Sequence, residues 1–103
     1  MLRAFRCDLH MHTCLSPCAE FDMYPKALID KCISEKLDLI AVCDHNASEN
    51  VPPVLSLAKG KPLTVLPGME ISSMEEVHLL ALFDDLGDLL KLQRIVYENL
   101  PGR

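Results

Sequence analysis

The chain has 103 residues, of which 50% are hydrophobic and 24% charged, and its formal net charge is −5 at pH 7. This length suits one domain, residues 1–103, and the composition is that of a globular protein. The apolar runs are far shorter than the roughly 20 residues that cross a bilayer, and the acidic charge argues against broad binding to a nucleic-acid backbone. Since the first residues also lack a secretory stretch, we expect a cytoplasmic protein that does not enter membranes.

The chain has five cysteines, without CxxC spacing or a secretion signal. These features predict reduced thiols rather than a disulfide framework. Cys7, Cys32 and Cys43 lie within apolar patterns and are expected in the core. Cys14 and Cys18 differ, because they lie in a predicted loop beside two histidines.

The first half of the chain predicts a strand, a loop, a helix and a second strand. Residues 3–12 alternate in part and end where the histidines begin, as expected for a strand. Residues 13–23 are typical of a loop. Apolar residues then recur at helical spacing over residues 24–37. The apolar run 38–43 predicts a strand that is buried on both faces of a parallel sheet.

The second half predicts a helix, two strands and a final helix. The helix covers residues 48–58, and the third strand covers residues 63–66 and leads into the extended stretch 69–72. A fourth strand over residues 77–83 follows too soon for a crossover helix, which favours an antiparallel hairpin. The last helix covers residues 84–99.

The alternation of strands and helices predicts an α/β fold of about four strands and three helices. Its sheet is expected to be mostly parallel, with right-handed crossovers. The pattern fits either an open sheet or the beginning of a barrel. Both architectures place their chemistry at the carboxyl ends of the strands.

Three successive predicted strands end in side chains that bind metals. His10 and His12 are two residues apart at the end of a strand, so they project to the same face and can hold one cation. His45 follows the second strand, and Glu70 follows the third. An HxH pair by itself could be two surface histidines, but its coincidence with the other two strand ends favours a metal site.

The predicted hairpin brings His78 into the same site. If the hairpin turns at about residue 74, Glu70 and His78 face one another with their β carbons about 5 Å apart. His78 is then either a further metal ligand or a strand residue that hydrogen-bonds Glu70.

Two more positions have alternative roles. Asp44 is either a ligand or, as we favour, a carboxylate that orients a ligating imidazole. Cys18 lies in a loop that could fold over the site, where a thiolate suits zinc or iron, and the alternative is an ordinary loop thiol. Glu20 and Asp22 are expected to be solvated acids of the same loop.

The mixture of nitrogen and oxygen ligands predicts the kind of metal and the chemistry. Such ligands favour Zn, Mn or Fe over Mg or Ca. These cations lower the pKa of a bound water and can hold the oxygens of a phosphate. Because the sequence contains neither a GxSxG motif nor a P-loop, metal-bound hydroxide is the predicted nucleophile.

The same residues form a recognisable set of motifs. They are Asp8-Leu9-His10-Met11-His12-Thr13, Cys43-Asp44-His45-Asn46 and Gly68-Met69-Glu70-Ile71. In this order they resemble the PHP (polymerase and histidinol phosphatase) family. The resemblance implies a distorted seven-stranded β/α barrel with two or three metals at its carboxyl end. It makes His10, His12, His45 and Glu70 metal ligands and catalytic residues, and it implies hydrolysis of phosphomonoesters or nucleotide-type phosphodiesters.

The length of the chain adds an expectation about partners. Barrels of this family need roughly twice this length, so the resemblance implies an N-terminal portion of the barrel. Such an open sheet exposes its edge strands, which predicts either a homo-oligomer or a missing C-terminal segment. The expected substrate is a phosphorylated small molecule or nucleotide. Two alternatives stay open: a non-catalytic metal-binding module of PHP type, and another HxH metal hydrolase of the amidohydrolase kind.

Overall fold

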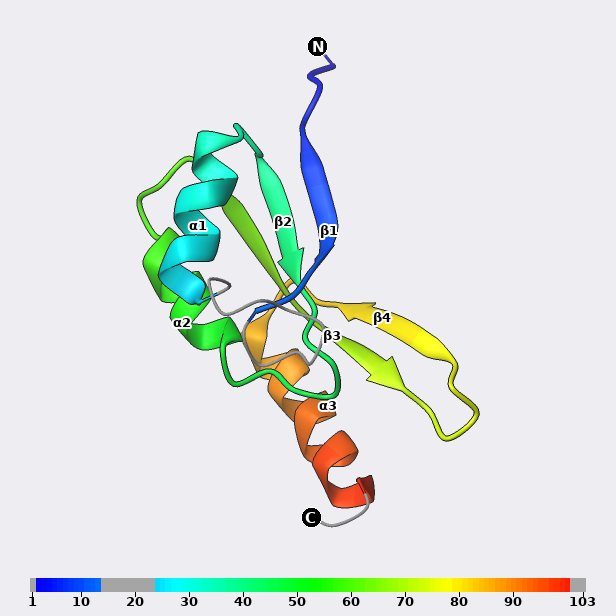
Figure 1. Ribbon diagram of the computed structural model, residues 1–103. Helices are drawn as coiled ribbons and strands as arrows, with labels where there is room; N and C mark the ends of the chain where they lie inside the picture. Colours follow the sequence, from blue (N-terminus) through cyan, green and yellow to red (C-terminus); the bar gives the residue numbers. More distant parts are fainter. Residues whose placement is uncertain (1, 14–23, 101–103) are drawn as a thin grey trace.

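The computed structural model describes residues 2–13 and 24–100, which form a four-stranded sheet and three helices (Figure 1). The elements are β1 (Cys7–Met11), α1 (Pro25–Ser34), β2 (Leu39–Val42), α2 (Val51–Ala58), β3 (Thr64–Ser72), β4 (His78–Leu82) and α3 (Leu86–Asn99). The strands lie in the order β1-β2-β3-β4, with β1, β2 and β3 parallel and β4 antiparallel to β3. The predicted α/β class is confirmed.

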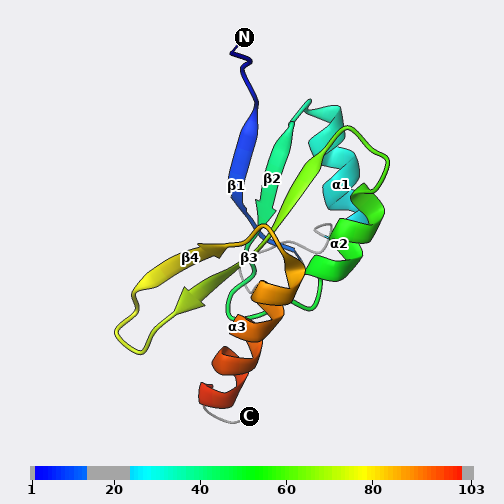
Figure 2. The ribbon, with the colours of Figure 1, turned by 180° about the vertical axis from the view of Figure 1, so that it is seen from behind.

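The core lies between the sheet and its helices. α1 and α2 lie side by side against the strands β1 to β3, while the β3–β4 hairpin projects away from both helices (Figure 2). The buried core cluster consists of Leu28, Ile29, Cys32, Ile40, Val42, Val51, Val54, Ala58, Leu63, Met69 and Leu89. Leu89 joins α3 to this cluster. None of the helices within the described residues has the length and hydropathy needed to cross a membrane.

The helix α1 ends three residues earlier than its apolar pattern predicts. Lys36 has a φ of 60°, and its amide donates to the carbonyl of Ile33 while the amide of Leu37 donates to Cys32, both at 3.0 Å. This pair of bonds is a Schellman motif, with a lysine at the left-handed position that glycine usually occupies. Leu37 therefore keeps its apolar contact with the core without belonging to the helix.

The strand β1 is shorter than the predicted 3–12. Arg6 links the segment before Cys7 to the sheet. Its carbonyl accepts from the amides of Asp38 and Leu39, and its amide donates to the Asp38 carboxylate at 2.9 Å. The pairing of β1 with β2 also shifts between Asp8 and Met11. Similarly, α2 begins at Val51 rather than at residue 48.

The strand β3 is one continuous strand that changes its partner. Its residues 64–67 pair with β2 in parallel, and residues 68–72 pair with β4 in antiparallel. The exchange takes place at Pro67, which has no amide hydrogen to donate, and at Gly68. A Cβ on Gly68 would lie 2.9 Å from the Cys43 sulfur, 3.0 Å from the Val42 carbonyl and 3.1 Å from the Ala81 carbonyl. Only glycine therefore allows three strands to meet here.

Candidate metal centre

The backbone of Glu70 is held on both sides at the point where β2 has ended. Its amide donates to the carbonyl of Asp44 at 3.0 Å, and its carbonyl accepts from the amide of Asn46 at 2.9 Å. These bonds form an isolated parallel bridge between His45 and Glu70. The chain after β2 thus pairs with β3 again, and the pairing fixes the position of Glu70 relative to His45.

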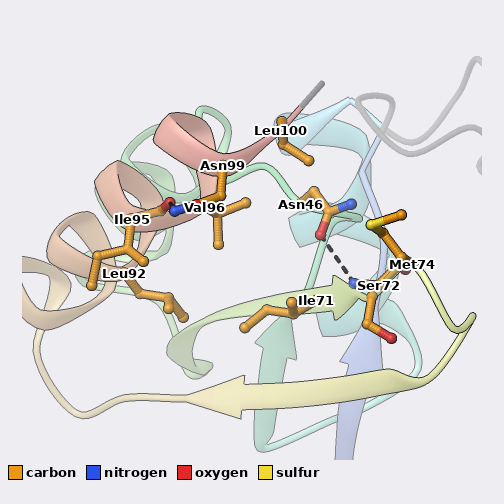
Figure 3. A pocket seen from close by; sticks show the side chains of 10 residues that line it. Asn46, Ile71, Ser72, Met74, Leu92, Ile95, Val96, Asn99 and Leu100 are labelled. Carbon is orange, nitrogen blue, oxygen red and sulfur yellow. Dashed lines mark hydrogen bonds between the residues drawn. The ribbon is translucent and has the colours of Figure 1, made fainter. Parts of the chain in front are cut away.

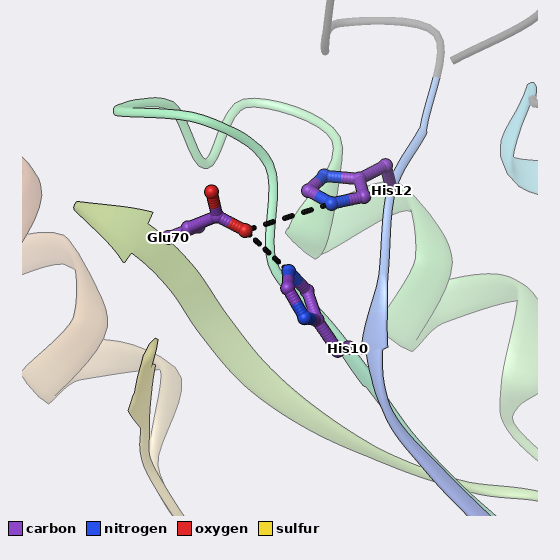
Figure 4. A group of neighbouring side chains, drawn as sticks. All are labelled: His10, His12 and Glu70. Atoms are coloured by element: carbon purple, nitrogen blue, oxygen red, sulfur yellow. Dashed lines mark hydrogen bonds and ion pairs between the residues drawn. The ribbon is translucent and has the colours of Figure 1, made fainter. Parts of the chain in front are cut away.

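The carboxylate of Glu70 lies at the centre of four imidazoles. Its side chain is only 5% exposed. The Oε1 atom accepts a hydrogen bond from His10 and lies 3.7 Å from Nε2 of His12 (Figure 4). The Oε2 atom lies 3.0 Å from Nδ1 of His45 and 2.7 Å from Nδ1 of His78. Each carboxylate oxygen therefore faces one pair of histidines.

The imidazoles also contact one another. The rings of His12 and His45 are stacked, with centroids 4.7 Å apart and planes 10° apart. The ring of His10 lies 5.0 Å from that of His12, and the ring of His78 lies 6.0 Å from that of His45. Side chains from the ends of β1 and β2 and from the start of β4 thus converge on one residue of β3.

The electrostatics of the cluster keep a carboxylate and an imidazole in the forms that bind metals. Burial by itself raises the pKa of Glu70, but hydrogen bonds from His78 and His10 and the charge of His45 outweigh it, so the pKa is lowered overall. Burial lowers the pKa of His12, and the neighbouring His45 lowers it further. An ionised carboxylate and a neutral imidazole are the states that coordinate a cation.

Asp44 supports the cluster through the residue that follows the HxH pair. Its buried carboxylate accepts a hydrogen bond from the amide of Thr13 at 2.6 Å and another from the Thr13 hydroxyl. The same hydroxyl accepts from Asn50 at 3.0 Å. Asp44 thus fastens the end of β1 beside β2. These bonds hold the residue that follows His12, and the orienting role of Asp44 toward an imidazole stays a prediction.

The hairpin register differs from the prediction. Glu70 pairs with Leu80, and His78 pairs with Ser72. The loop consists of residues 74–76 and is closed by Ser73 and Val77, with Glu76 at a φ of 62°. A three-residue loop with a left-handed last residue centres the turn on residue 75 rather than 74. His78 nevertheless contacts Glu70 diagonally across the two strands.

The convergent donors are spaced closely enough to hold a metal ion. Two groups have ligand atoms that all lie within 4.8 Å of one another: His10, His12 and Glu70, and His45, Glu70 and His78. The first group contains only predicted ligands, and so does the second. Glu70 belongs to both groups through different oxygens. Cys18, Glu20 and Asp22 lie outside the described residues.

Several polar residues of the site escaped the sequence analysis. Asn46 has a φ of 51°, and its Oδ1 accepts from the amide of Ser72 at 3.0 Å. The hydroxyl of Ser72 lies 3.2 Å from Nδ1 of His78. Asn46 and Thr13 each directly follow a motif histidine, and asparagine tolerates left-handed conformations. That proximity to the motifs was the available signal.

A cavity of about 400 Å³ lies beside the cluster, between the end of β3 and the C-terminal half of α3 (Figure 3). Its aliphatic lining includes Ile71, Leu92 and Val96. The Asn46–Ser72 hydrogen bond forms part of its wall. Because Ser72 also contacts His78, this residue connects the cavity with the histidine cluster.

Comparisons with known proteins agree with this architecture. The chain resembles a candidate metal-dependent phosphoesterase from Bifidobacterium adolescentis with 28% identity and a TM-score of 0.63 over 78% of this chain and 28% of that protein. It shares its fold with an amidohydrolase from Chromobacterium violaceum, whose structure holds sulfate and no metal. The two sequences are 23% identical and the TM-score is 0.68, over 90% of this chain and 34% of the amidohydrolase. The chain thus spans about a third or less of either protein.

No curated protein matches the chain. The family model of the PHP domain, by contrast, matches residues 8–99. This match contains all three motifs and every residue of the histidine cluster. The chain therefore belongs to the PHP domain family, as its motifs predicted.

Proposed function

We propose that this chain carries the metal-binding residues of a phosphoesterase that hydrolyses phosphomonoesters or nucleotide-type phosphodiesters. The observation that carries the proposal is the sharing of one buried carboxylate, Glu70, by two pairs of histidines. A carboxylate that presents a separate oxygen to each pair is suited to bridge two cations. Membership of the PHP family and the likeness to a candidate phosphoesterase support the same reaction class.

In this proposal the residues have separate roles. His10 and His12 would hold one cation together with Glu70, and His45 and His78 would hold a second together with the same carboxylate. Four nitrogens and a shared carboxylate favour Zn, Mn or Fe over Mg or Ca. When bound, such a metal pair supplies Lewis acidity and activates water for attack on phosphorus.

The surrounding residues keep these ligands in place. Asp44 holds Thr13 and with it the end of β1, and the Asn46–Glu70 backbone bond holds the segment that carries His45. The net charge of −5 gives the chain no general attraction for phosphate. In our proposal the bound cations therefore supply the positive charge that attracts the substrate.

The experiment measures metal content and turnover in the same samples. The purified chain is loaded with Mn, Zn or Fe, its metal is quantified by mass spectrometry, and hydrolysis of 4-nitrophenyl phosphate and bis(4-nitrophenyl) phosphate is followed. We expect about two metals per chain, about one after His10→Ala with His12→Ala, and about one after His45→Ala with His78→Ala. The exposed ion pair Lys26–Asp30 on α1 provides the control, Lys26→Ala.

The other outcomes separate the alternatives. Metal binding without turnover of either phosphoester favours a non-catalytic module. Cleavage of an amide substrate such as an acyl 4-nitroanilide, without phosphoester cleavage, favours the amidohydrolase reading. Unchanged metal content in both double variants contradicts the assignment of the histidines.

A further inference from the structure

The segment that carries His45 turns away from the sheet immediately after its bridge with Glu70. The amide of Asn46 donates to the carbonyl of Glu70 at 2.9 Å. In a regular parallel ladder the next bond would join the amide of Ser72 to the backbone carbonyl of Asn46. Asn46 instead has a φ of 51°, a left-handed conformation that ends the extended backbone. Pairing beyond Glu70 therefore needs another acceptor in the place of that carbonyl.

The side chain of Asn46 supplies this acceptor. Its Oδ1 atom accepts from the amide of Ser72 at 3.0 Å (Figure 3). Asparagine combines the two properties that the position requires, because it tolerates the left-handed conformation and its amide oxygen can imitate a backbone carbonyl. The bond extends the pairing of the His45 segment with β3 by one step and fixes the backbone of Ser72.

Ser72 faces His78 across the hairpin. The two residues are partners in the register of β3 and β4, and the pair beside them, Ser73 and Val77, is joined by a backbone hydrogen bond. In antiparallel strands the pair next to a hydrogen-bonded one brings its side chains closest together. The hydroxyl of Ser72 accordingly lies 3.2 Å from Nδ1 of His78, the atom that also contacts Glu70 at 2.7 Å.

His78 is the imidazole of the cluster that most needs an anchor. Its side chain is 54% exposed, more than the side chains of the other three histidines. An exposed side chain keeps rotamer freedom that it must lose when it binds a cation. A hydrogen-bonding partner that orients a ligating imidazole in advance reduces this loss. Glu70 is itself a ligand in the proposed site, whereas Ser72 is not.

We propose that Ser72 is a positioning residue for the second cation, the one assigned to His45 and His78, and that Asn46 acts through it. The hydroxyl of Ser72 holds the ring of His78 beside Glu70, and the side chain of Asn46 holds Ser72 in place. This inference rests on the two-cation site of the proposed function. Because the bonds lead to His78, their effect should be confined to the second cation.

Zinc titration by calorimetry, with each cation site studied alone, tests the proposal. One background carries His10→Ala with His12→Ala and keeps the second site. The other carries His45→Ala with His78→Ala and keeps the first. We expect Ser72→Ala to weaken zinc binding about tenfold in the first background and to leave the affinity unchanged in the second. Circular dichroism checks that each variant is folded.

Further variants in the background that keeps the second site separate positioning from general stability. Ser72→Thr keeps the hydroxyl and should bind zinc as before. Asn46→Gly keeps the left-handed backbone but removes Oδ1, so it should also weaken binding about tenfold. Asn46→Asp keeps an acceptor and should bind at least as tightly as the background. Ser34→Ala is the matched control, because it removes an exposed hydroxyl that donates to a backbone carbonyl of α1.

The outcomes distinguish this inference from the proposed function. Unchanged zinc affinity of the second site in both Ser72→Ala and Asn46→Gly overturns the inference. Equal weakening of both sites also overturns it, because the residues would then support the fold as a whole. Selective weakening of the second site, in a chain that hydrolyses neither phosphoester, supports the inference and contradicts the phosphoesterase activity. A background that should keep the second site but binds no zinc contradicts both.

Discussion

His45 and Glu70 are joined both through their backbones and through their side chains. They form an isolated parallel bridge, and Nδ1 of His45 lies 3.0 Å from Oε2 of Glu70. The sheet itself therefore sets the distance between a strand-end imidazole and the central carboxylate. Placement on regular backbone holds ligands more rigidly than placement on loops.

Replacing Glu70 with glutamine tests whether its charge is essential. The amide keeps the size of the side chain but loses its charge, and its nitrogen faces one of the two histidine pairs. We expect the affinity for zinc to fall by about 100-fold or more. Isothermal titration calorimetry measures the change, and Glu75→Gln on the exposed hairpin loop is the control. Equal affinities in Glu70→Gln and wild type would refute the central role of the carboxylate.

Asp44→Asn should affect stability more than metal content. The buried carboxylate accepts two hydrogen bonds from Thr13, and an amide can accept only through its single oxygen. We expect the free energy of unfolding to fall by about 1–3 kcal/mol, measured by urea denaturation without metal. Metal stoichiometry should persist, with weaker affinity. Loss of one metal per chain would instead identify Asp44 as a ligand.

Gly68→Ala should destabilise the fold. The added methyl meets the Val42 and Ala81 carbonyls at 3.0 and 3.1 Å, in addition to the Cys43 sulfur. We expect a loss of about 1–3 kcal/mol in thermal or urea unfolding. Gly87→Ala is the matched control, because the three atoms nearest to its Cβ all belong to the exposed Asp85 side chain rather than to backbone. Replacing Cys43 with alanine in the Gly68→Ala background should restore only part of the loss, because both carbonyls remain.

Buried thiols should resist alkylation. Burial, helped by nearby carboxylates, raises the pKa of Cys43 to about 12, and burial raises that of Cys32. Cys7 is exposed, so its predicted place in the core is wrong, whereas Cys32 and Cys43 are buried as predicted. At pH 8 iodoacetamide should therefore modify Cys7 much faster than Cys32 or Cys43. Peptide mapping by mass spectrometry gives the rate for each cysteine. Equal rates for all three in the folded protein would contradict the burial.

The same shift has a defined consequence for stability. The folded state holds the Cys43 proton more tightly than the unfolded state, whose thiol has a pKa of about 8.5. The stabilisation from this group is therefore complete below pH 8.5, about the unfolded value, and declines as the pH rises toward the folded pKa of about 12. Urea denaturation of wild type and Cys43→Ala at increasing pH should show the difference between them shrinking.

The sequence determined the kinds of elements and predicted most of the side chains that converge on Glu70. Helical spacing located α1 and α3, the apolar run located β2, and the short connection after β3 predicted the hairpin. His10, His12, His45 and Glu70 were found because parallel strands bring their carboxyl ends together. These inferences need only local periodicity and one rule about strand ends, so the sequence was sufficient for them.

Only the tertiary structure decided how these residues meet. The left-handed Glu76 sets a three-residue loop and shifts the hairpin register, which no apolar pattern encodes. The exchange of partners by β3 at Gly68 depends on three strands that crowd one position. The curl of the sheet brings the two oxygens of Glu70 to different pairs of histidines. It also brings Thr13 within hydrogen-bonding distance of Asp44. Curl and register result from long-range packing, because they depend on contacts between residues far apart in the chain.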